Sequence, residues 1–245
     1  MSGHSHWATI KHKKGAEDAK RGKVFSKISR EIAIAIKEGG ANPDSNNKLK
    51  MIFEKARSVN MPKDNIERVI KKATGGGADA EVLEEVMLEV LKQPEDAAVL
   101  VEAITDNKNR TLGDIKKILA KLGGKLVPEG TLKWMFERKG LIVIDLSQNS
   151  KPADELEMLA IDAGAQDIAI DSTFCSIFTS IPELEKTKKA LEDAGVKIES
   201  ASFGWFAKDV KQIDLRAQEN VKKLLEELDD NDDIQNVYTN VDFQE

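Results

Sequence analysis

Apolar residues recur at helical spacing in the first third of the chain. Between Val24 and Ile36 they fall three and four positions apart, and the run is followed by Gly39 and Gly40. A glycine in the left-handed conformation is a common way to end a helix. The pattern therefore predicts an amphipathic helix that begins near Glu17 and stops at these two glycines.

Two more helices of the same kind are predicted next. Asn42-Pro43-Asp44 offers a cap, a first-turn proline and a first-turn acid for the second helix, and Pro62 opens the third. Short amphipathic helices bury their apolar stripes against one another, so residues 1–78 are predicted to form a three-helix bundle preceded by an exposed basic arm. The glycine-rich segment 75–79 is predicted to be a linker and a domain boundary.

Beyond the linker the pattern changes to mixed helices and strands. Strands are predicted at 82–91, 97–105, 125–136, 141–146, 167–180 (two strands or one bent one), 196–207 and 234–239, and helices at 110–122, 153–163, 182–194 and 215–228. The order β-α-β-β-α-β within residues 137–207 is that of a ferredoxin-like domain. We therefore expect a multidomain α+β fold in which this domain is inserted into a second α+β domain, made of residues 79–136 and 208–245.

Charge divides the chain in the same place. Its 245 residues hold 37 Lys+Arg and 43 Asp+Glu, for a net charge of −6. Residues 1–78 alone contain 17 basic and 8 acidic residues and carry +9, while the remainder carries −15. Such a division indicates one part that faces a polyanion and one acidic, solvated part.

The basic part supplies the candidate binding residues. At 100° per residue, four cations of the first helix share the side opposite its apolar stripe, and the arm adds further cations and an aromatic ring that can stack on a base. The predicted nucleic-acid-binding residues are Trp7, Lys11, His12, Lys13, Lys14, Lys20, Arg21, Lys23, Lys27, Arg30, Lys63 and Arg68. Recognition of the phosphate backbone or of RNA shape fits them better than reading of bases in a major groove.

Catalysis is not predicted. The sequence has no phosphate-binding loop, no nucleophile elbow and no paired cysteines, and all three histidines lie within the first 12 residues. Cys175, the single cysteine, has no basic neighbour that would activate it and is expected in a core. The acidic cluster 229–233 lacks the glycine and glutamate of a calcium loop and is predicted to be a solvated turn. We expect no enzyme activity, no cofactor and no metal site.

Location and assembly are inferred from what the sequence lacks. No apolar run approaches the roughly 20 residues needed to cross a bilayer, and the N-terminus has no secretory signal. One cysteine agrees with a reducing compartment. The expected location is cytoplasmic, without a membrane partner, and with no dimer-forming element visible we expect a monomer.

Several long motifs resemble those of the YebC/PmpR family, and they occur in order along nearly the whole chain. They are Gly3-His4-Ser5-His6-Trp7-Ala8-Thr9-Ile10-Lys11-His12-Lys13-Lys14, Asp18-Ala19-Lys20-Arg21-Gly22-Lys23, Asn60-Met61-Pro62-Lys63-Asp64-Asn65-Ile66-Glu67-Arg68, Thr105-Asp106-Asn107-Lys108-Asn109-Arg110-Thr111 and Gln235-Asn236-Val237-Tyr238-Thr239-Asn240. The resemblance implies a helical N-terminal domain and two α+β domains, one inserted in the other. Where the family usually has Tyr-x-Gly-Tyr-Gly-Pro-Gly-Gly, this chain has Leu91-Lys92-Gln93-Pro94-Glu95-Asp96-Ala97-Ala98. Contacts that need the close backbone approach of glycine are therefore not expected at this hairpin.

The resemblance implies a regulator of gene expression. Bacterial members are described as cytoplasmic, DNA-binding transcriptional regulators, which makes regulation of transcription on duplex DNA the first hypothesis. The related mitochondrial protein is a translational activator of cytochrome c oxidase subunit one, and bacterial relatives have been connected with ribosomes stalled on proline-rich chains. The alternative is therefore translation regulation through ribosomal RNA and the ribosome, which the lysine-rich arm favours. An acidic scaffold for protein interactions is the third hypothesis.

Overall fold

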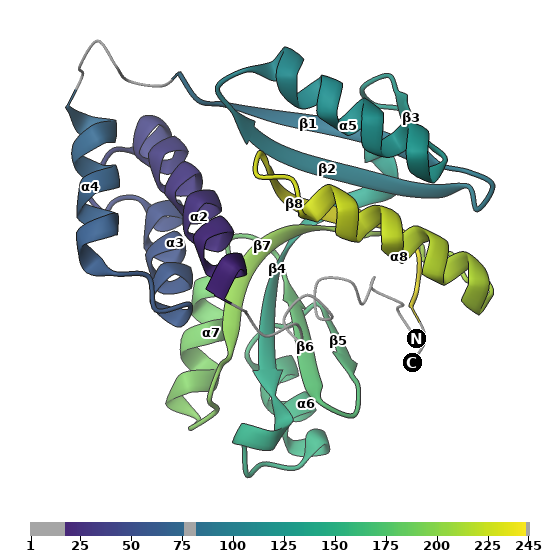
Figure 1. Ribbon diagram of the computed structural model, residues 1–245. Coiled ribbons are helices and arrows are strands. Elements are labelled where there is room, and N and C mark those ends of the chain that lie inside the picture. Colours follow the sequence, from purple (N-terminus) through teal and green to yellow (C-terminus); the bar gives the residue numbers. More distant parts are fainter. Residues whose placement is uncertain (1–17, 76–81, 244–245) are drawn as a thin grey trace. The chain divides into compact units, whose positions relative to one another are not determined.

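The computed structural model describes residues 18–75 and 82–243 of the protein. Over these residues the chain forms helices α2 to α8 and two four-stranded sheets (Figure 1). The sequence prediction of a multidomain α+β fold is confirmed. None of the described helices combines the length and the apolar character needed to span a membrane.

The chain folds into two compact units. The first unit contains the described residues up to Glu129 together with Arg216–Val237, and the second contains Gly130–Leu215 and the residues from Tyr238 onward. The chain crosses between the units after Glu129, Leu215 and Val237, so Arg216–Val237 is separated in sequence from the helices with which it folds.

Three helices open the first unit: α2 (Asp18–Gly39), α3 (Asn47–Ser58) and α4 (Lys63–Thr74). Apolar residues of all three meet in one core around Ile28, Ile32 and Leu49. Helix α2 ends as predicted, since Gly40 has a φ of +81° and its N–H donates to the Ile36 carbonyl at 2.8 Å.

The predicted start of the second helix is wrong. Its cap is Asn46 and not the Asn42-Pro43-Asp44 segment, which forms a turn. The Asn46 side chain accepts from Leu49 N–H at 3.0 Å and donates to the carbonyls of Ala35 and Gly40, each at 2.8 Å. Asn46 thus begins α3 and ties it to the end of α2, a contact that favours the later start.

The first sheet has the strand order β3-β1-β2-β8, with β1 (Glu84–Lys92), β2 (Ala97–Thr105), β3 (Gly124–Val127) and β8 (Ile234–Thr239). Strands β1 and β2 form an antiparallel hairpin in which Val90 faces Val99. Helices α5 (Lys108–Leu122) and α8 (Leu215–Asp229) complete this part. Ile34 of α2 packs against Leu83 and Ile104, so the helical part contacts the sheet within the first unit.

A buried ion pair fixes the tip of the β1–β2 hairpin. The Lys92 ammonium lies 2.6 Å from the Glu95 carboxylate, and the two side chains are only 5% and 3% exposed. Asn220 of α8 donates to the same carboxylate at 3.0 Å, and Gln93 N–H donates to the Gly123 carbonyl. Side-chain contacts thus anchor the tip of this hairpin.

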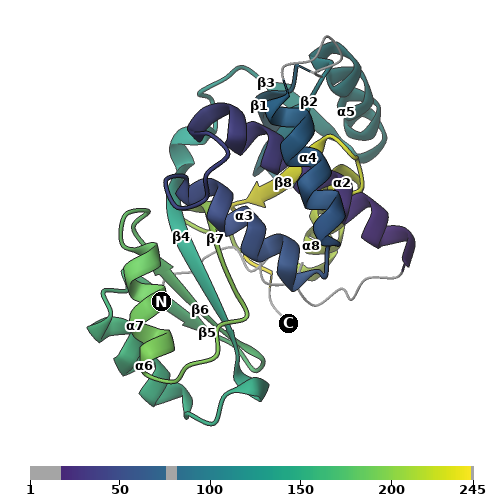
Figure 2. The same cartoon turned by 90° about the vertical axis from the view of Figure 1, so that its left-hand side faces the viewer.

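The second sheet has the order β5-β6-β4-β7, made of β4 (Phe136–Asp145), β5 (Asp167–Ile170), β6 (Phe174–Thr179) and β7 (Ser200–Ala207). Helices α6 (Ala153–Asp162) and α7 (Leu184–Asp193) lie on one face (Figure 2). Leu141 and Val143 join a cluster of Phe174, Phe178 and Phe206. The alternate residues Ile142 and Ile144 are fully buried too, so β4 is apolar on both faces.

The prediction of one continuous strand at residues 125–136 is wrong. Residues 125–136 contain β3, a turn and the 3-10 helix η1 (Lys133–Met135), and β4 starts only at Phe136. The turn includes Gly130 with a φ of +86°, which interrupts the extended backbone. The chain therefore leaves the first sheet after Val127 and enters the second at Phe136.

Candidate nucleic-acid interface

Part of the predicted interface lies outside the described residues. The arm residues Trp7, Lys11, His12, Lys13 and Lys14 belong to this part. Lys20 is in the first turn of α2, in a stretch whose side chains are not described, and Arg21 follows it with an exposed side chain.

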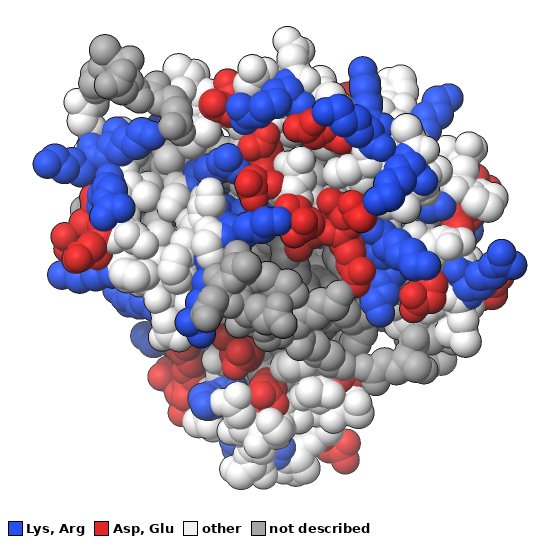
Figure 3. All heavy atoms as spheres, in the orientation of Figure 1, with Lys and Arg blue, Asp and Glu red and all other residues white. Residues whose placement is uncertain are grey.

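The basic side of α2 contacts the acidic turn between α8 and β8. Lys23 lies 2.7 Å from the Asp230 carboxylate, and Lys27 lies 3.3 Å from that of Asp229 while donating to the Asp229 carbonyl at 2.5 Å. Figure 3 shows acidic side chains gathered where α8 ends, beside basic side chains of α2. The sequence predicted only a solvated turn, whereas in the structure the turn contacts α2.

Arg30 makes the deepest of these contacts. Its guanidinium lies 3.1 Å from the Asp233 carboxylate, and it also donates to the Asp232 carbonyl. The Arg30 side chain is 23% exposed and that of Asp233 only 8%, whereas Lys23 and Asp230 are 43% and 74% exposed. Exposed ion pairs contribute about 0–1 kcal/mol, and loss of one partner costs more when the pair is buried. Of the ion pairs between α2 and this turn, that of Arg30 and Asp233 is therefore expected to contribute most to stability.

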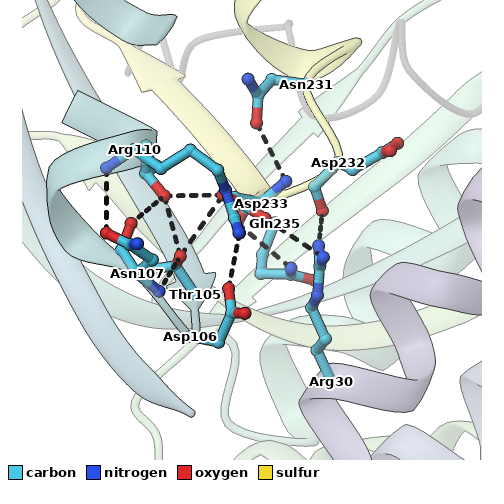
Figure 4. Close-up of polar contacts among 10 residues, drawn as sticks. Arg30, Thr105, Asp106, Asn107, Arg110, Asn231, Asp232, Asp233 and Gln235 are labelled. Atoms are coloured by element: carbon cyan, nitrogen blue, oxygen red, sulfur yellow. Dashed lines mark hydrogen bonds and ion pairs between the residues drawn. The ribbon is translucent and has the colours of Figure 1, made fainter. Parts of the chain in front are cut away.

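Three side chains of the β2–α5 junction also contact the Asp233 carboxylate (Figure 4). Thr111 donates its hydroxyl to the Asp233 carboxylate at 2.6 Å, Thr105 does so at 3.3 Å, and Arg110 lies 3.3 Å from the same oxygen. The Asp233 carbonyl accepts the N–H of Ile104 at 2.8 Å. Two guanidinium groups and two hydroxyls thus converge on one carboxylate. Such a set of donors suits an oxyanion, and the Asp233 side chain is the anion that occupies it.

Local sequence explains how Arg110 reaches this position. Asn107 caps α5 by accepting the N–H of Arg110 at 3.1 Å, which begins the helix just before the arginine. Asp106 accepts from Arg110 at 2.5 Å, and this hydrogen bond lowers the pKa of Asp106. The bonds to Asp106 and Asp233 raise the pKa of Arg110. Hydrogen bonding to Asp230 similarly raises the pKa of Lys23. Asp106, Arg110 and Lys23 therefore stay charged near neutral pH, and the ion pairs that they form persist there.

Helix α4 presents the other predicted cations. Lys63 and Arg68 are exposed, and Lys63 lies 3.4 Å from the Glu67 carboxylate. Figure 3 shows Lys and Arg side chains along the side of the molecule where Figure 1 places α4. Arg57, Arg68 and Lys71 are exposed and have no ion-pair partner among the described residues. Arg57 was missing from the sequence prediction, because its position after the apolar stripe of α3 gave no sign of a shared surface.

The described residues contain neither a cluster of metal ligands nor a reactive thiol. They contain no group of three His, Cys, Asp or Glu that could hold a metal ion. Burial raises the pKa of the Cys175 thiol to about 12, with smaller contributions from Glu157 and Asp171. This thiol is therefore held in its unreactive, protonated form.

Comparison with known proteins gives matches over nearly the whole chain. Residues 5–76 match the family model described as "TACO1/YebC protein N-terminal domain", and residues 83–241 match "TACO1/YebC second and third domain". A protein of Thermoanaerobacter pseudethanolicus is 45% identical over 100% of this chain and 98% of its own length, and one of Desulfotalea psychrophila is 46% identical over 100% and 97%. Both are named "Probable transcriptional regulatory protein". The crystal structure of a conserved hypothetical protein from Aquifex aeolicus superimposes with a TM-score of 0.89 at 42% identity, covering 98% of each chain.

Proposed function

Since the chain belongs to the TACO1/YebC family, we propose that it is a non-catalytic regulator of transcription that binds duplex DNA through its helical N-terminal part. The names of its relatives support a regulatory role. The observation that supports this binding surface is a set of exposed cations on α3 and α4. Arg57, Arg68 and Lys71 are exposed without ion-pair partners among the described residues, so phosphates can approach them without displacing a carboxylate.

The α2 cations play a different part in this proposal. Lys23, Lys27 and Arg30 are already held by carboxylates of the first unit, so a phosphate must compete with those groups. The contact surface that we propose is therefore the α4 side. The arm residues Trp7, Lys11, His12, Lys13 and Lys14 stay contacts predicted from the sequence alone. The acidic remainder of the chain limits indiscriminate coating of nucleic acid.

The test measures affinity for duplex DNA in rising salt with the full-length protein. The variant Arg57→Gln/Arg68→Gln/Lys71→Gln should bind more weakly, and the slope of log affinity against log salt should fall by about 2 to 3, since each phosphate contact contributes roughly 0.9. Lys116→Gln/Lys125→Gln/Lys223→Gln removes the same charge from exposed positions elsewhere in the first unit. Equal losses in both triple variants would show that only net charge matters and would contradict the proposed surface.

A translational role on structured RNA is the second candidate. One observation favours it: the exposed side chains of α4 include Lys63, Asp64, Glu67, Arg68 and Lys71, and Asn65, the one amide of the helix that could read an adenine edge, is only partly exposed. A helix of this kind contacts phosphates rather than base edges, and backbone and shape contacts are the usual mode of recognition for structured RNA. Competition between a candidate promoter, its scrambled duplex and folded ribosomal RNA at one salt concentration separates the two roles. Preference for the promoter supports transcription, and preference for the RNA supports translation.

A further inference from the structure

Two of the three tryptophans lie at one corner of the second unit. Trp134 belongs to η1 and is 66% exposed. Its indole N–H donates to the Thr131 carbonyl at 2.8 Å, so the orientation of the exposed ring is restricted. Trp205 lies on β7, and the Lys133 ammonium is 5.1 Å from the centre of its ring. This corner thus holds an exposed aromatic ring beside a cation stacked on a second ring.

Backbone pairing brings these residues together. Lys208 N–H donates to the Met135 carbonyl at 2.9 Å, so η1 lies beside the end of β7. Arg138 of β4 faces Trp205 of β7 directly in the strand register, and the two strands run side by side (Figure 1). Side chains of directly paired residues lie on the same face of a sheet. Trp134, Trp205 and three cations therefore share one small region.

The charge of this corner is positive. Arg138 and Lys208 are exposed and form no ion pair with any residue that the structure describes. The carboxylate of the nearby Glu137 is already paired, since it lies 2.7 Å from the Lys139 ammonium. Asp209, which directly follows Lys208 in the sequence, is an exposed acid. Lys133, Arg138 and Lys208 together outweigh it.

We propose that this corner, named here the Trp134 platform (Lys133, Trp134, Arg138, Trp205 and Lys208), binds single-stranded RNA by stacking an unpaired base on Trp134 while the cations contact the adjacent phosphates. An exposed indole offers a flat surface to any base, and flanking cations suit the backbone that connects successive bases. Unpaired bases are displayed by the loops and bulges of RNA, whereas those of duplex DNA remain stacked inside the helix. The platform is therefore a contact separate from the cations of α4.

The test uses a fluorescein-labelled oligoadenylate RNA and fluorescence anisotropy with the full-length protein. Trp134→Ala should weaken binding about 10-fold, the loss expected for one stacked base, and Trp134→Phe should retain most of the affinity because it keeps an aromatic face. Met158→Ala removes another apolar side chain of the same unit, one that is 67% exposed, and should have no effect. Equal affinity in wild type and Trp134→Ala would overturn the proposal, as would equal losses in the Ala and Phe variants.

Charge reversal tests the phosphate contact. Arg138→Glu should weaken oligoadenylate binding and lower its salt dependence. Lys189→Glu makes the same change at an exposed position of α7 that has no ion-pair partner among the described residues, and it should have neither effect. Equal effects of the two reversals would contradict a local contact. An oligodeoxyadenylate of equal length forms the second arm, and binding of DNA as tight as that of RNA would overturn the choice of RNA.

The outcome is separable from that of the proposed function. Duplex binding that depends on Arg57, Arg68 and Lys71 can persist in Trp134→Ala, in which case the transcriptional proposal stands without the platform. Absence of oligoadenylate binding by the wild-type protein would overturn the platform alone. Loss of duplex binding by Trp134→Ala would instead assign both ligands to one surface and contradict a separate site.

Discussion

Arg30 of α2 and Asp233, the residue before β8, face each other with 3.1 Å between guanidinium and carboxylate. The contact joins the helical part of the first unit to its sheet, because Asp233 also accepts from Thr111 and lies 3.3 Å from Arg110 of α5. A single carboxylate thus connects three segments that are far apart in the sequence.

Asp233→Asn should lower the free energy of unfolding by about 2–3 kcal/mol. The amide keeps the size of the side chain but leaves Arg30 and Arg110 without their shared negative charge, a loss that costs less here than the 3–5 kcal/mol of a fully buried pair. Urea denaturation followed by circular dichroism measures the change. Asp232→Asn is the matched control, since that side chain is exposed. If both variants lost the same free energy of unfolding, the contacts of the Asp233 carboxylate would not be the cause.

Neutralising the outer part of the acidic turn should increase affinity for polyanions. In Asp229→Asn/Asp230→Asn the ammonium groups of Lys23 and Lys27 lose their carboxylate partners, so a phosphate no longer has to displace them. We expect duplex DNA to bind a few-fold more tightly at low salt, with a steeper salt dependence. Glu84→Gln/Glu219→Gln makes the same change in net charge at exposed positions of the first unit, and a similar gain there would reduce the effect to long-range charge.

Glu95→Gln should destabilise the protein by about 3–5 kcal/mol, because it leaves the buried Lys92 ammonium without a counter-charge. The double variant Lys92→Met/Glu95→Leu should recover most of this loss, since apolar residues of similar volume can replace a buried pair. Denaturant midpoints of the three proteins provide the comparison. A double variant as unstable as Glu95→Gln would show that the hairpin tip needs the polar contact with Asn220.

The same pair gives a dependence on pH. Burial by itself would raise the pKa of Glu95, but hydrogen bonds from Lys92 and Asn220 outweigh it and hold the pKa below its ordinary value of 4.5. A carboxylate with a lowered pKa in the folded state contributes stability above its ordinary pKa and loses that contribution as the pH falls through the folded value. Stability of the wild type should therefore fall below about pH 4.5. The double variant should show a shallower fall, and parallel curves would contradict this assignment.

Gly140→Ala should destabilise the second unit by about 1–3 kcal/mol through overpacking. A Cβ at this position would lie 2.5 Å from the Thr179 hydroxyl and 2.8 Å from a methyl carbon of Leu184. Gly113→Ala is the matched control, since nothing lies within 4 Å of a Cβ there, and it should stabilise α5 by about 0.5–1 kcal/mol. Thermal unfolding of both variants distinguishes the two effects, and similar shifts would contradict the role of packing.

Local patterns predicted most of the secondary structure. Strands β2 and β8 have the bounds expected from their sequence, because each is a β-favouring run with clear polar limits. The start of α3 was missed because Asn46 is chosen over Asn42 by its bonds to Ala35 and Gly40, and these depend on how α2 ends. Asn42 and Asn46 could both cap a helix by their sequence context, and the contacts with the end of α2 decide for Asn46.

The candidate site was less accessible to sequence reasoning. Helical periodicity placed Lys23, Lys27 and Arg30 on one side of α2, and that arrangement is what the structure shows. Nothing local indicated that the Asp229–Asp233 turn would meet them, because the partners are separated by almost the whole length of the chain. Periodicity gives the direction of a side chain, whereas its partner depends on tertiary structure.

The discontinuous composition of the first unit also has a consequence during synthesis. Its last piece, Arg216–Val237, follows the whole Gly130–Leu215 segment in the chain. Because translation proceeds from the N-terminus, α2 leaves the ribosome long before the carboxylates that will bind its cations. A nascent or truncated chain that ends before Asp229 lacks the carboxylates that lie against Lys23, Lys27 and Arg30 in the finished protein. Such fragments should therefore adhere to ribosomal RNA more strongly than the finished protein does.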